Sequence, residues 1–412
     1  MLSIYSFAIR LYFLAVLLAS VWNRKARRFI HGRKGIWNKL EKIASDHASP
    51  VWFHCSSLGE FEQGRSLIER IKQENPSIPI ILTFFSSSGY EIRKHYPMVD
   101  AVCYLPIDTP ENARHFIRLL SPRLAVFIKY DFWFNYLFTL RKFAIPFIFV
   151  SVRMRNDHFL FRTVFRKLLR IFSQAHHIFT QDQETANILK TNKIKQATVA
   201  GDTRVDQVFN ISRSEFKKYP PLLKFNQGKT IVLGSIWPED WDVLRSLFVQ
   251  NKTTYGLIVA SHEVSGSFIN ELKDDLDPLV YRVSQLPDRP DSQINHILVD
   301  TIGDLAYLYR YGDLAYVGGG FGKGIHNILE PAIYGIPVLF GPNYKKFGEA
   351  ENFIKMGAAK KIETTRDLEM AIQHFESPAI KSMVKKSLSV YFERQRGATD
   401  KIFSYLSAER LL

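Results

Sequence analysis

Cysteine is scarce in this chain, in which only Cys55 and Cys103 occur among 412 residues. Two cysteines provide neither a disulfide framework nor a zinc-binding spacing, and this usage fits a reducing compartment. A Walker loop, an HExxH motif and a CxxC pair are also absent from the sequence. His176 and His177 are adjacent on a predicted strand and would face opposite sides of it, so they would not chelate one metal ion. We therefore expect no metal and no cofactor.

Acidic residues are the minority among the charges, with 40 Asp and Glu against 55 Lys and Arg and a net charge of +15. This excess predicts an anionic partner, such as nucleic acid, acidic lipid or a phosphorylated substrate. The densest basic run, residues 24–34, lies beside an apolar segment, which favours a membrane surface over nucleic acid. With 412 residues, of which 46% are hydrophobic, the chain is long enough for two α/β domains.

A long apolar segment occupies residues 2–22 and is interrupted only by Ser3, Ser6, Arg10 and Ser20. Its length is close to the roughly 20 residues that span a bilayer. Arg10 would be costly at the midplane of a bilayer but cheap in a helix that lies at its surface. No small-residue cleavage site follows, so we predict an uncleaved anchor with its basic flank and the rest of the chain on the cytoplasmic side. A buried helix of a soluble domain is the alternative, and the sequence leaves a spanning and a surface-lying anchor open.

From residue 51 onward, short apolar strands alternate with amphipathic helices, which is the signature of a doubly wound parallel sheet. Strands are predicted at 51–55, 78–84, 101–105, 124–128, 147–150, 176–180 and 197–200, and then at 230–233, 256–260, 279–283, 296–299, 314–317 and 338–340. The polar stretch 206–229 is the predicted linker between the two series. We therefore expect a membrane anchor with a basic collar at 1–34, one Rossmann-like domain at 35–213 and a second at 214–412, whose last helix folds back on the first.

A cluster of glycines follows the predicted strand 314–317, at positions 318, 319, 320, 322 and 324. A helix at 327–334 and a strand at 338–340 complete a parallel βαβ unit, and its glycine turn lies at the edge where ligands of open α/β sheets bind. Glycines let backbone N–H groups approach an anion, so Gly319 and Gly320 are candidate anion contacts. Glu330, in the first turn of this helix, either stabilises the helix dipole or accepts hydrogen bonds from ribose hydroxyls.

Two further loops follow strands at the same predicted edge. His262 comes after the strand 256–260, and Asp304 comes after the strand 296–299. Three loops that converge on one edge predict a nucleotide pocket. Taken alone, a histidine is usually an ordinary surface or core residue, and Asp304 can instead cap the helix that begins at Leu305.

In the first domain, Glu60 follows Ser56-Ser57-Leu58-Gly59 at the end of the first strand. A carboxylate there can act as the general base for an attacking hydroxyl, or it can simply stabilise the dipole of its helix. Arg153, after the strand 147–150, and Arg204, near the domain junction, are candidate contacts for an anionic group, although most arginines are simply solvated. The aromatic run at 130–136 is interpreted as core packing.

Together these motifs resemble the Kdo transferases, glycosyltransferases that move 3-deoxy-D-manno-octulosonic acid (Kdo) from CMP-Kdo to the lipid A precursor lipid IVA. The resemblance covers most of the chain and rests on Ser57-Leu58-Gly59-Glu60, on 201–206 and 301–305, and most specifically on His326-Asn327-Ile328-Leu329-Glu330-Pro331 with Gly341-Pro342. It implies the GT-B fold, with an acceptor-binding and a CMP-sugar-binding Rossmann-like domain facing a cleft. It also implies an inner-membrane enzyme whose catalytic domains work at the cytoplasmic face beside anionic lipid, with no nucleic-acid partner.

Carried over residue by residue, the resemblance makes Glu60 the proton acceptor of an inverting, metal-free transfer. It assigns the CMP contacts to Ser261, His262, Ile302, Gly303, Asp304, Asn327, Ile328, Leu329 and Glu330. The sequence departs from the family pattern at Lys129, Ser261, Trp237, Gly320, Ile325 and Ile328, and these changes bear on individual phosphate contacts rather than on the fold. Two other interpretations remain: a GT-B glycosyltransferase or epimerase that uses a UDP sugar, and a basic membrane-surface scaffold.

Overall fold

The computed structural model describes residues 1–412 except 130, 216–228, 251–253, 264–265, 278–279 and 287–295. The chain forms two compact units: unit 1 comprises Met1–Gln207 with Gln395–Leu412, and unit 2 comprises Val208–Arg394. This division falls inside helix α10 (Thr203–Arg213), whereas the sequence placed the domain boundary at 213/214. Residues 206–213 of the expected linker are therefore helical, and its residues 216–228 lie outside the described part of the chain.

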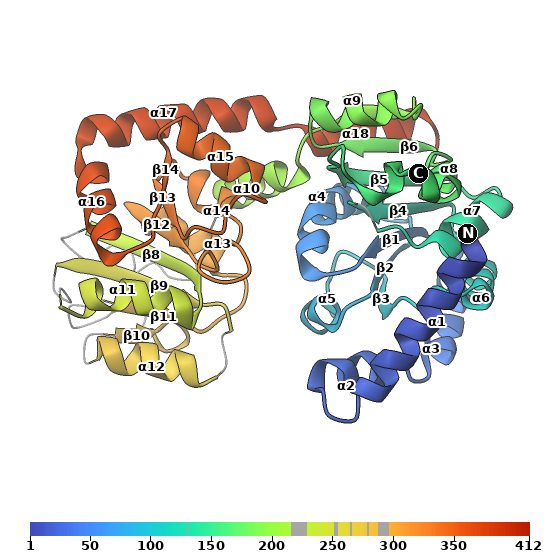
Figure 1. Cartoon of the computed structure of the whole chain (residues 1–412), viewed down its shortest axis with the longest axis horizontal. Coiled ribbons are helices and arrows are strands. Elements are labelled where there is room, and N and C mark those ends of the chain that lie inside the picture. The colour runs from blue at the N-terminus through green and yellow to red at the C-terminus, as the bar shows by residue number, and fades with distance from the viewer. Residues whose placement is uncertain (130, 216–228, 251–253, 264–265, 278–279, 287–295) are drawn as a thin grey trace. The chain divides into compact units, whose positions relative to one another are not determined.

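Unit 1 is built on a seven-stranded parallel sheet in the order β3-β2-β1-β4-β5-β6-β7 (Figure 1). Its strands are β1 (Val51–Cys55), β2 (Ile80–Phe84), β3 (Ala101–Tyr104), β4 (Leu124–Ile128), β5 (Phe147–Val152), β6 (His177–Thr180) and β7 (Ala197–Val199). Every residue of β1, β2 and β4 is buried, because helices cover both faces of the sheet. This burial explains why these strands read as uninterrupted apolar runs in the sequence. Since β1 pairs with both β2 and β4, the loops after all three strands lie side by side.

The helices that follow these strands form two separate cores. They are α4 (Leu58–Glu74), α5 (Ser87–Arg93), α6 (Pro110–Leu120), α7 (Phe134–Lys142), α8 (Arg166–Phe172) and α9 (Gln183–Thr191). Neighbouring side chains of a strand point to opposite faces. Trp52 therefore packs with α6 and α7, while Phe53 packs with α4. Two 3-10 turns, Phe159–Phe161 and Thr163–Phe165, precede α8.

The end of the chain belongs to unit 1. Helix α18 (Ala398–Ala408) packs against α4 and contributes Ile402 and Leu406 to the same core as Phe53. The carboxylate of Asp206 accepts hydrogen bonds from the backbone N–H groups of Gly397 and Thr399, at 2.6 and 2.7 Å. These bonds hold the first turn of α18, whose backbone N–H groups have no partner within the helix.

Three helices precede the first strand: α1 (Leu2–Ala19), α2 (Arg24–His31) and α3 (Ile36–Asp46). By length and composition, α1 can cross a membrane, and it is the only such helix in the part of the chain that the structure describes. Only Ser6 of α1 is buried, so the alternative of a buried core helix is wrong. Arg27, in α2, donates hydrogen bonds to the carbonyl oxygens of Ser20 and Val21, at 3.1 and 2.5 Å, and so fixes the turn between the two helices.

Unit 2 contains a second seven-stranded parallel sheet, in the order β10-β11-β9-β8-β12-β13-β14 (Figure 1). Its strands are β8 (Lys229–Ile236), β9 (Tyr255–Ser261), β10 (Val280–Arg282), β11 (His296–Val299), β12 (Leu314–Val317), β13 (Val338–Phe340) and β14 (Ala359–Lys361). Its helices are α11 (Pro238–Gln250), α12 (Ser267–Leu276), α13 (Leu305–Leu308), α14 (Leu329–Ala332), α15 (Gly348–Lys355), α16 (Thr365–Glu376) and α17 (Pro378–Gln395). The four strands β11, β9, β8 and β12 are adjacent, so the loops after them share one edge of the sheet.

Unit 2 departs from the sequence prediction in several elements. The short edge strand β14 was not predicted, because two of its three residues are lysines. The helix expected at 327–334 is reduced to α14, and Gly335, at φ +77°, turns the chain away after it. The strand expected at 279–283 is β10, and residue 279 lies outside the described residues.

Candidate functional site

Glu60 lies in the first turn of α4, directly after the carboxyl end of β1. The hydroxyl of Ser57 donates a hydrogen bond to its Oε2 atom at 2.8 Å, which fixes the direction of the carboxylate. Burial raises the pKa of Glu60, and this hydrogen bond and the charge of Lys129 oppose the rise. A carboxylate with a raised pKa is a stronger base than an ordinary surface acid. The position also suits stabilisation of the helix dipole, so both interpretations of Glu60 fit its place in the fold.

A second carboxylate, Asp131, lies at the same edge of the sheet, after β4. It accepts hydrogen bonds from the backbone N–H of Ser56 at 2.9 Å and from the Ser56 hydroxyl at 2.6 Å. Burial, and then the negative charge of Glu60, raise the pKa of Asp131 well above its usual value. The two carboxyl groups therefore titrate as a pair, in which ionisation of one disfavours ionisation of the other. From the sequence, Asp131 was interpreted as part of an aromatic packing run, whose first residue, Tyr130, lies outside the described residues.

Lys129 provides the positive charge at this edge. It directly follows β4, has a φ of +60°, and donates its backbone N–H to the carbonyl oxygen of Val150 at 2.7 Å. Against the upward effect of burial, its charge lowers the pKa of Glu60, Asp131 and Asp202. One lysine therefore acts on carboxyl groups from three separate loops, which brings these loops together as one electrostatic site.

His54 lies beneath this pair of carboxylates, fully buried in β1. Its Nε2 atom is 3.7 Å from Oδ2 of Asp131, and its Nδ1 atom is 2.8 Å from the hydroxyl of Thr83. Burial, with the charge of Arg33, lowers the pKa of His54 to about 3. The imidazole is therefore neutral at physiological pH and forms no ion pair with Asp131.

The two predicted arginine contacts of unit 1 are both paired with acids. Arg204 forms an ion pair with Asp202, with Nη2 and Oδ2 2.6 Å apart, and both side chains are largely buried. Burial acts to raise the pKa of Asp202, but the charge of Arg204 opposes this effect, and the pKa of Asp202 lies below its usual value. Arg153 lies more exposed, 3.4 Å from Asp182. The guanidinium of Arg204 is thus held in place at the sheet edge, while Arg153 lies in a solvated ion pair.

In unit 2, the glycine turn after β12 is a point of close chain approach. A Cβ atom on Gly318 would lie 2.4 Å from the carbonyl oxygen of Ser235, and one on Gly320 would lie 2.5 Å from the backbone nitrogen of Gly341. The N–H of Gly319 donates a hydrogen bond to Oδ2 of Asp240 at 2.8 Å. This bond occupies the backbone N–H of Gly319, so the prediction that Gly319 contacts an anion is not retained. The turn contributes mainly by letting three loops pack closely.

Asp240 organises this edge of unit 2 and was missed in the sequence. It is fully buried in the first turn of α11 and accepts hydrogen bonds from Gly319, from the Trp237 N–H and from the Tyr316 hydroxyl. Burial raises its pKa, while these hydrogen bonds act in the other direction. A buried carboxylate with three donors fixes the loops after β8 and β12 relative to each other.

Three aromatic side chains gather at the same edge: Trp237 after β8, His262 after β9 and His326 after β12. His262 stacks on Trp237 and on His326, with ring centroids 4.2 and 4.5 Å apart. The ring planes of Trp237 and His326 are nearly parallel, and Nε1 of Trp237 donates to Nε2 of His326 at 3.1 Å. Burial, with the neighbouring His262, lowers the pKa of His326 to about 4, so His326 is neutral and carries its proton on Nδ1. The sequence singled out His262, but the stack is visible only once the strands are paired.

The motif around α14 forms a small hydrogen-bonded unit. The Asn327 side chain donates to Oε1 of Glu330 at 3.1 Å and accepts from the backbone N–H of Leu329 at 3.3 Å. Ile328 and Leu329 are buried, so only their backbone atoms are placed to contact a ligand. Glu330 presents its carboxylate at the start of α14, beside Asn327.

The remaining predicted contacts lie in the neighbouring loops of this edge. Ser261, at the end of β9, is buried and donates its hydroxyl to the carbonyl oxygen of Glu263. After β11, Ile302 is 65% exposed and Gly303 has a φ of +94°. Asp304 is buried and accepts a hydrogen bond from the Thr301 hydroxyl at 2.5 Å. Its side chain makes no capping hydrogen bond to α13, so the capping explanation of Asp304 is wrong. Within the described residues, no group of three or more His, Cys, Asp or Glu side chains is placed to hold a metal ion.

Two solved structures show which fold class this arrangement belongs to. The UDP-GlcNAc 2-epimerase of Neisseria meningitidis matches with a TM-score of 0.60 at 13% identity, over 87% of this chain and 100% of its own. MurG of Acinetobacter baumannii matches with a TM-score of 0.55 at 12% identity, over 87% of this chain and 99% of its own. Two Rossmann-like units with parallel sheets, similar to these enzymes, define the GT-B fold and confirm the predicted fold class.

Sequence comparison shows which enzymes of that class the chain is similar to. Residues 24–207 match the family model described as 3-deoxy-D-manno-octulosonic-acid transferase. The chain is 25% identical to such a transferase of Chlamydophila psittaci, over 91% of this chain and 90% of the relative. It is 26% identical to that of Aquifex aeolicus, over 81% of this chain and 88% of the relative. The chain is similar to Kdo transferases over most of its length, as its motifs predicted, and it is a glycosyltransferase.

Proposed function

We propose that this enzyme transfers Kdo from CMP-Kdo to a lipid A precursor in lipopolysaccharide biosynthesis, with inversion at the anomeric carbon. Sequence similarity supports the donor sugar, since relatives along most of the chain are named for Kdo transfer. One observation supports the mechanism most strongly: Glu60, with a pKa raised by burial, is oriented by Ser57 at the carboxyl edge of the first sheet.

In the proposed reaction, Glu60 removes the proton of the acceptor's primary sugar hydroxyl as its oxygen attacks the anomeric carbon of Kdo. A new carbon–oxygen bond forms at that carbon while its bond to the phosphate oxygen of CMP breaks. Displacement by one nucleophile inverts the anomeric configuration, and no covalent intermediate on the enzyme is required. Burial raises the pKa of Glu60 and so makes its carboxylate a stronger base once it is ionised, while the charge of Glu60 raises the pKa of the neighbouring Asp131.

The donor is assigned to the edge of unit 2 where β8, β9, β11 and β12 end. Glu330, oriented by Asn327, is suited to accept hydrogen bonds from the ribose hydroxyls of CMP. The stacked side chains of Trp237, His262 and His326 offer a flat surface for the cytosine base. The leaving group is a monophosphate ester, so backbone N–H groups and a basic side chain are sufficient to stabilise its charge without a metal. Arg204 and Gly320 remain candidate anion contacts, and Arg153 is a weaker one.

We also propose that the enzyme works on the cytoplasmic face of the inner membrane. Helix α1 has the length and composition of a membrane helix, and the basic residues 24–34 follow it directly. Basic residues beside an apolar helix favour the cytoplasmic side and contact with anionic lipid. An acceptor that is itself a lipid explains why a GT-B enzyme of this kind needs such a segment.

The experiment that tests the function is incubation of the purified protein with CMP-Kdo and tetraacylated lipid A precursor, followed by mass spectrometry of the lipid. The expected product carries the mass of one or more added Kdo residues, and the Glu60→Gln variant should give none. A lipid of unchanged mass with wild-type protein would overturn the proposal. Because MurG and the UDP-GlcNAc 2-epimerase share the fold, UDP-sugar use is the second candidate, and calorimetry with CMP against UDP separates the two.

A further inference from the structure

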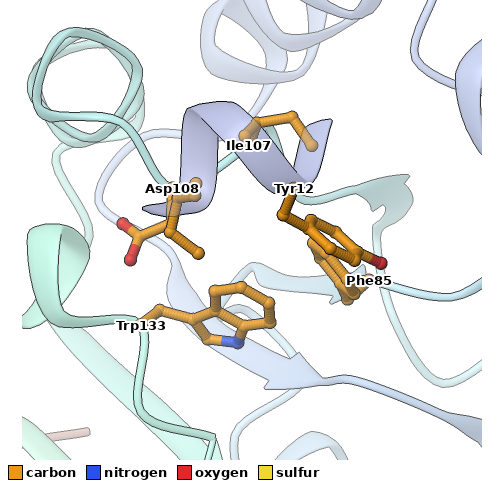
Figure 2. A pocket seen from close by; sticks show the side chains of 6 residues that line it. Tyr12, Phe85, Ile107, Asp108 and Trp133 are labelled. Atoms are coloured by element: carbon orange, nitrogen blue, oxygen red, sulfur yellow. The ribbon is translucent and has the colours of Figure 1, made fainter. Parts of the chain in front are cut away.

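An apolar pocket of about 240 Å³ lies in unit 1 between α1 and the edge of the sheet (Figure 2). Ile9 and Tyr12 of α1 form one wall, and the other walls come from the loops after β2, β3 and β4. These other lining residues are Phe85, Ile107, Asp108 and Trp133. An apolar helix face and aromatic side chains enclose a space that suits a hydrocarbon chain rather than a polar ligand.

Polar contacts fix the α1 wall of this pocket to unit 1. The hydroxyl of Tyr5 donates to Oδ2 of Asp108 at 2.6 Å, and the hydroxyl of Ser6 donates to the side-chain oxygen of Asn135 at 3.0 Å. Arg10 forms an ion pair with Glu111, with 2.9 Å between Nη2 and Oε2. The N-terminal half of α1 is therefore held along the catalytic unit at three points.

The lining acid, Asp108, does not make the pocket polar. Besides the Tyr5 hydroxyl, its carboxylate accepts hydrogen bonds from the backbone N–H groups of Asn135 and Tyr136, at 3.3 and 3.1 Å. The two backbone N–H groups belong to the first turn of α7, and each bonds a different oxygen of the Asp108 carboxylate, so both oxygens have a partner. The pocket is accordingly bounded by the hydrocarbon and ring surfaces of its other residues.

The opposite face of α1 is exposed and apolar. Five of its exposed large side chains recur every three or four residues, which places these five on one stripe of the helix. They are Ile4, Phe7, Leu11, Leu14 and Leu18, between 50% and 69% exposed. A stripe of this kind inserts into the boundary between headgroups and acyl chains of a membrane. Thus one face of α1 suits lipid while the other lines the pocket.

Trp133 joins the pocket to the site of chemistry. It lies two residues after Asp131, and it also lines a second cavity of about 350 Å³, whose walls include Asp131 and Tyr5. On the other side, Phe85 precedes Ser86, whose backbone N–H donates to the carbonyl oxygen of Ser56 at 2.8 Å. Ser56 in turn holds Asp131. The pocket thus adjoins the network that orients the acidic pair.

From these observations we propose that the pocket lined by Ile9, Tyr12, Phe85 and Trp133 binds an acyl chain of the lipid acceptor. This inference rests on the proposed function and assigns α1 a second role, as a wall of the acceptor site. The occupant is an acyl chain because the pocket lies between a lipid-facing helix stripe and the carboxylates that act on the acceptor's hydroxyl. A lipid held there presents its sugar headgroup toward Glu60 while its other chains remain in the membrane.

The test compares Ile9→Trp, which fills the pocket, with Leu14→Trp, which adds the same ring to the exposed stripe of α1. Transfer is measured in detergent with the tetraacylated precursor and with its deacylated, water-soluble disaccharide. We expect Ile9→Trp to raise KM for the acylated acceptor about tenfold with KM for the deacylated one unchanged, because the chain loses its binding site. Leu14→Trp should leave both KM values as in the wild type.

A second variant guards against misfolding of the first. Tyr12 is half exposed, so Tyr12→Ala removes a wall with little effect on folding, and it should also reduce the preference for the acylated acceptor. If both variants keep the wild-type preference, or if they impair both acceptors equally, the pocket is not an acyl site. Wild-type protein that transfers Kdo to neither acceptor would instead overturn the proposed function itself. Transfer to the deacylated acceptor by the wild-type protein shows that the proposed function holds, so a failure of the acyl site can be told apart from a failure of the function.

Discussion

Ser56 donates two hydrogen bonds to a single carboxylate, that of Asp131, through its backbone N–H at 2.9 Å and its hydroxyl at 2.6 Å. The next residue, Ser57, donates its hydroxyl to Glu60 at 2.8 Å. Two consecutive serines at the end of β1 therefore orient the two acids of the site. Each carboxylate is held by one of the two serines that directly follow a buried strand, so little reorganisation is needed when a substrate arrives.

The first prediction concerns Glu60 as the base. Glu60→Gln keeps the size of the side chain and can still accept from Ser57, but it cannot remove a proton. We expect transfer to fall by at least about a hundredfold, the usual contribution of a general base, while CMP-Kdo affinity stays within about twofold. Rapid-quench assays and calorimetry measure the two quantities. The matched control is Glu62→Gln, which should remain active. Glu62 lies two residues further along α4 and forms an ion pair with Arg93. A fully active Glu60→Gln enzyme would remove Glu60 from this role.

The second prediction follows from the effect of Lys129 on the pKa of Glu60. The reaction needs ionised Glu60, so the rate should fall as the pH drops below the pKa of this group. Burial raises that pKa and Lys129 restrains the rise, so Lys129→Met should move the acid limb of the pH–rate profile to higher pH. Lys142→Met, an exposed lysine at the end of α7, is the control and should leave the profile in place. An unshifted acid limb in Lys129→Met would show that the lysine charge does not act on the base.

A third prediction links the same pKa to stability. Because the folded pKa of Glu60 is raised, the folded protein binds this proton more tightly than the unfolded chain does. The contribution of Glu60 to stability is then largest at low pH and declines as the pH rises from the unfolded value toward the folded one. Glu60→Gln should consequently stabilise the protein more at pH 8 than at pH 5, and raise Tm more at the higher pH. Calorimetry at the two pH values measures this, and equal shifts would contradict the raised pKa.

Much of the fold was predictable because strands buried on both faces read as continuous apolar runs. The bounds of β1, β4, β11, β12 and β13 agree with the sequence prediction residue for residue. Glu60 was found because it follows such a run at a glycine-containing turn. The family resemblance identified the activity class from motifs that local structure alone left ambiguous.

Other parts of the site were not predictable, because they depend on strand pairing. Asp131 is bonded to Ser56 across 75 positions of sequence, and only the pairing of β1 with β4 brings the two together. Trp237 and His326 are 89 positions apart, and their hydrogen bond depends on the adjacent position of β8 and β12. Gly319 was assigned to an anion because nothing in the sequence indicates that Asp240, 79 positions earlier, accepts its N–H. A sequence motif therefore predicts which loops form the site. Which of their hydrogen-bond donors remain available to a ligand depends on partners that only the tertiary structure shows.

A fourth prediction tests the two interpretations of Glu330, as a ribose contact or as a structural acid of α14. Glu330→Ala should weaken CMP binding about tenfold, since a hydrogen bond to a charged group contributes about 1.5 kcal/mol. Asn327→Ala breaks the 3.1 Å bond that orients Glu330 and should weaken CMP binding by a smaller factor. Calorimetry gives both dissociation constants, and thermal unfolding reports any loss of stability. A lowered Tm with an unchanged dissociation constant would make Glu330 purely structural.

The last prediction concerns α1, which is expected both to hold the enzyme at the membrane and to bind its substrate. Deleting residues 1–22 should move the protein from the membrane fraction to the soluble fraction, because the exposed stripe Ile4 to Leu18 is lost. In detergent, where anchoring no longer matters, the deletion should still raise KM for the tetraacylated acceptor, because Ile9 and Tyr12 are gone from the pocket. Activity on the deacylated disaccharide is the internal control and should persist. Continued membrane association of the deleted protein would contradict the anchor, and an unchanged KM for the acylated lipid would restrict α1 to anchoring alone.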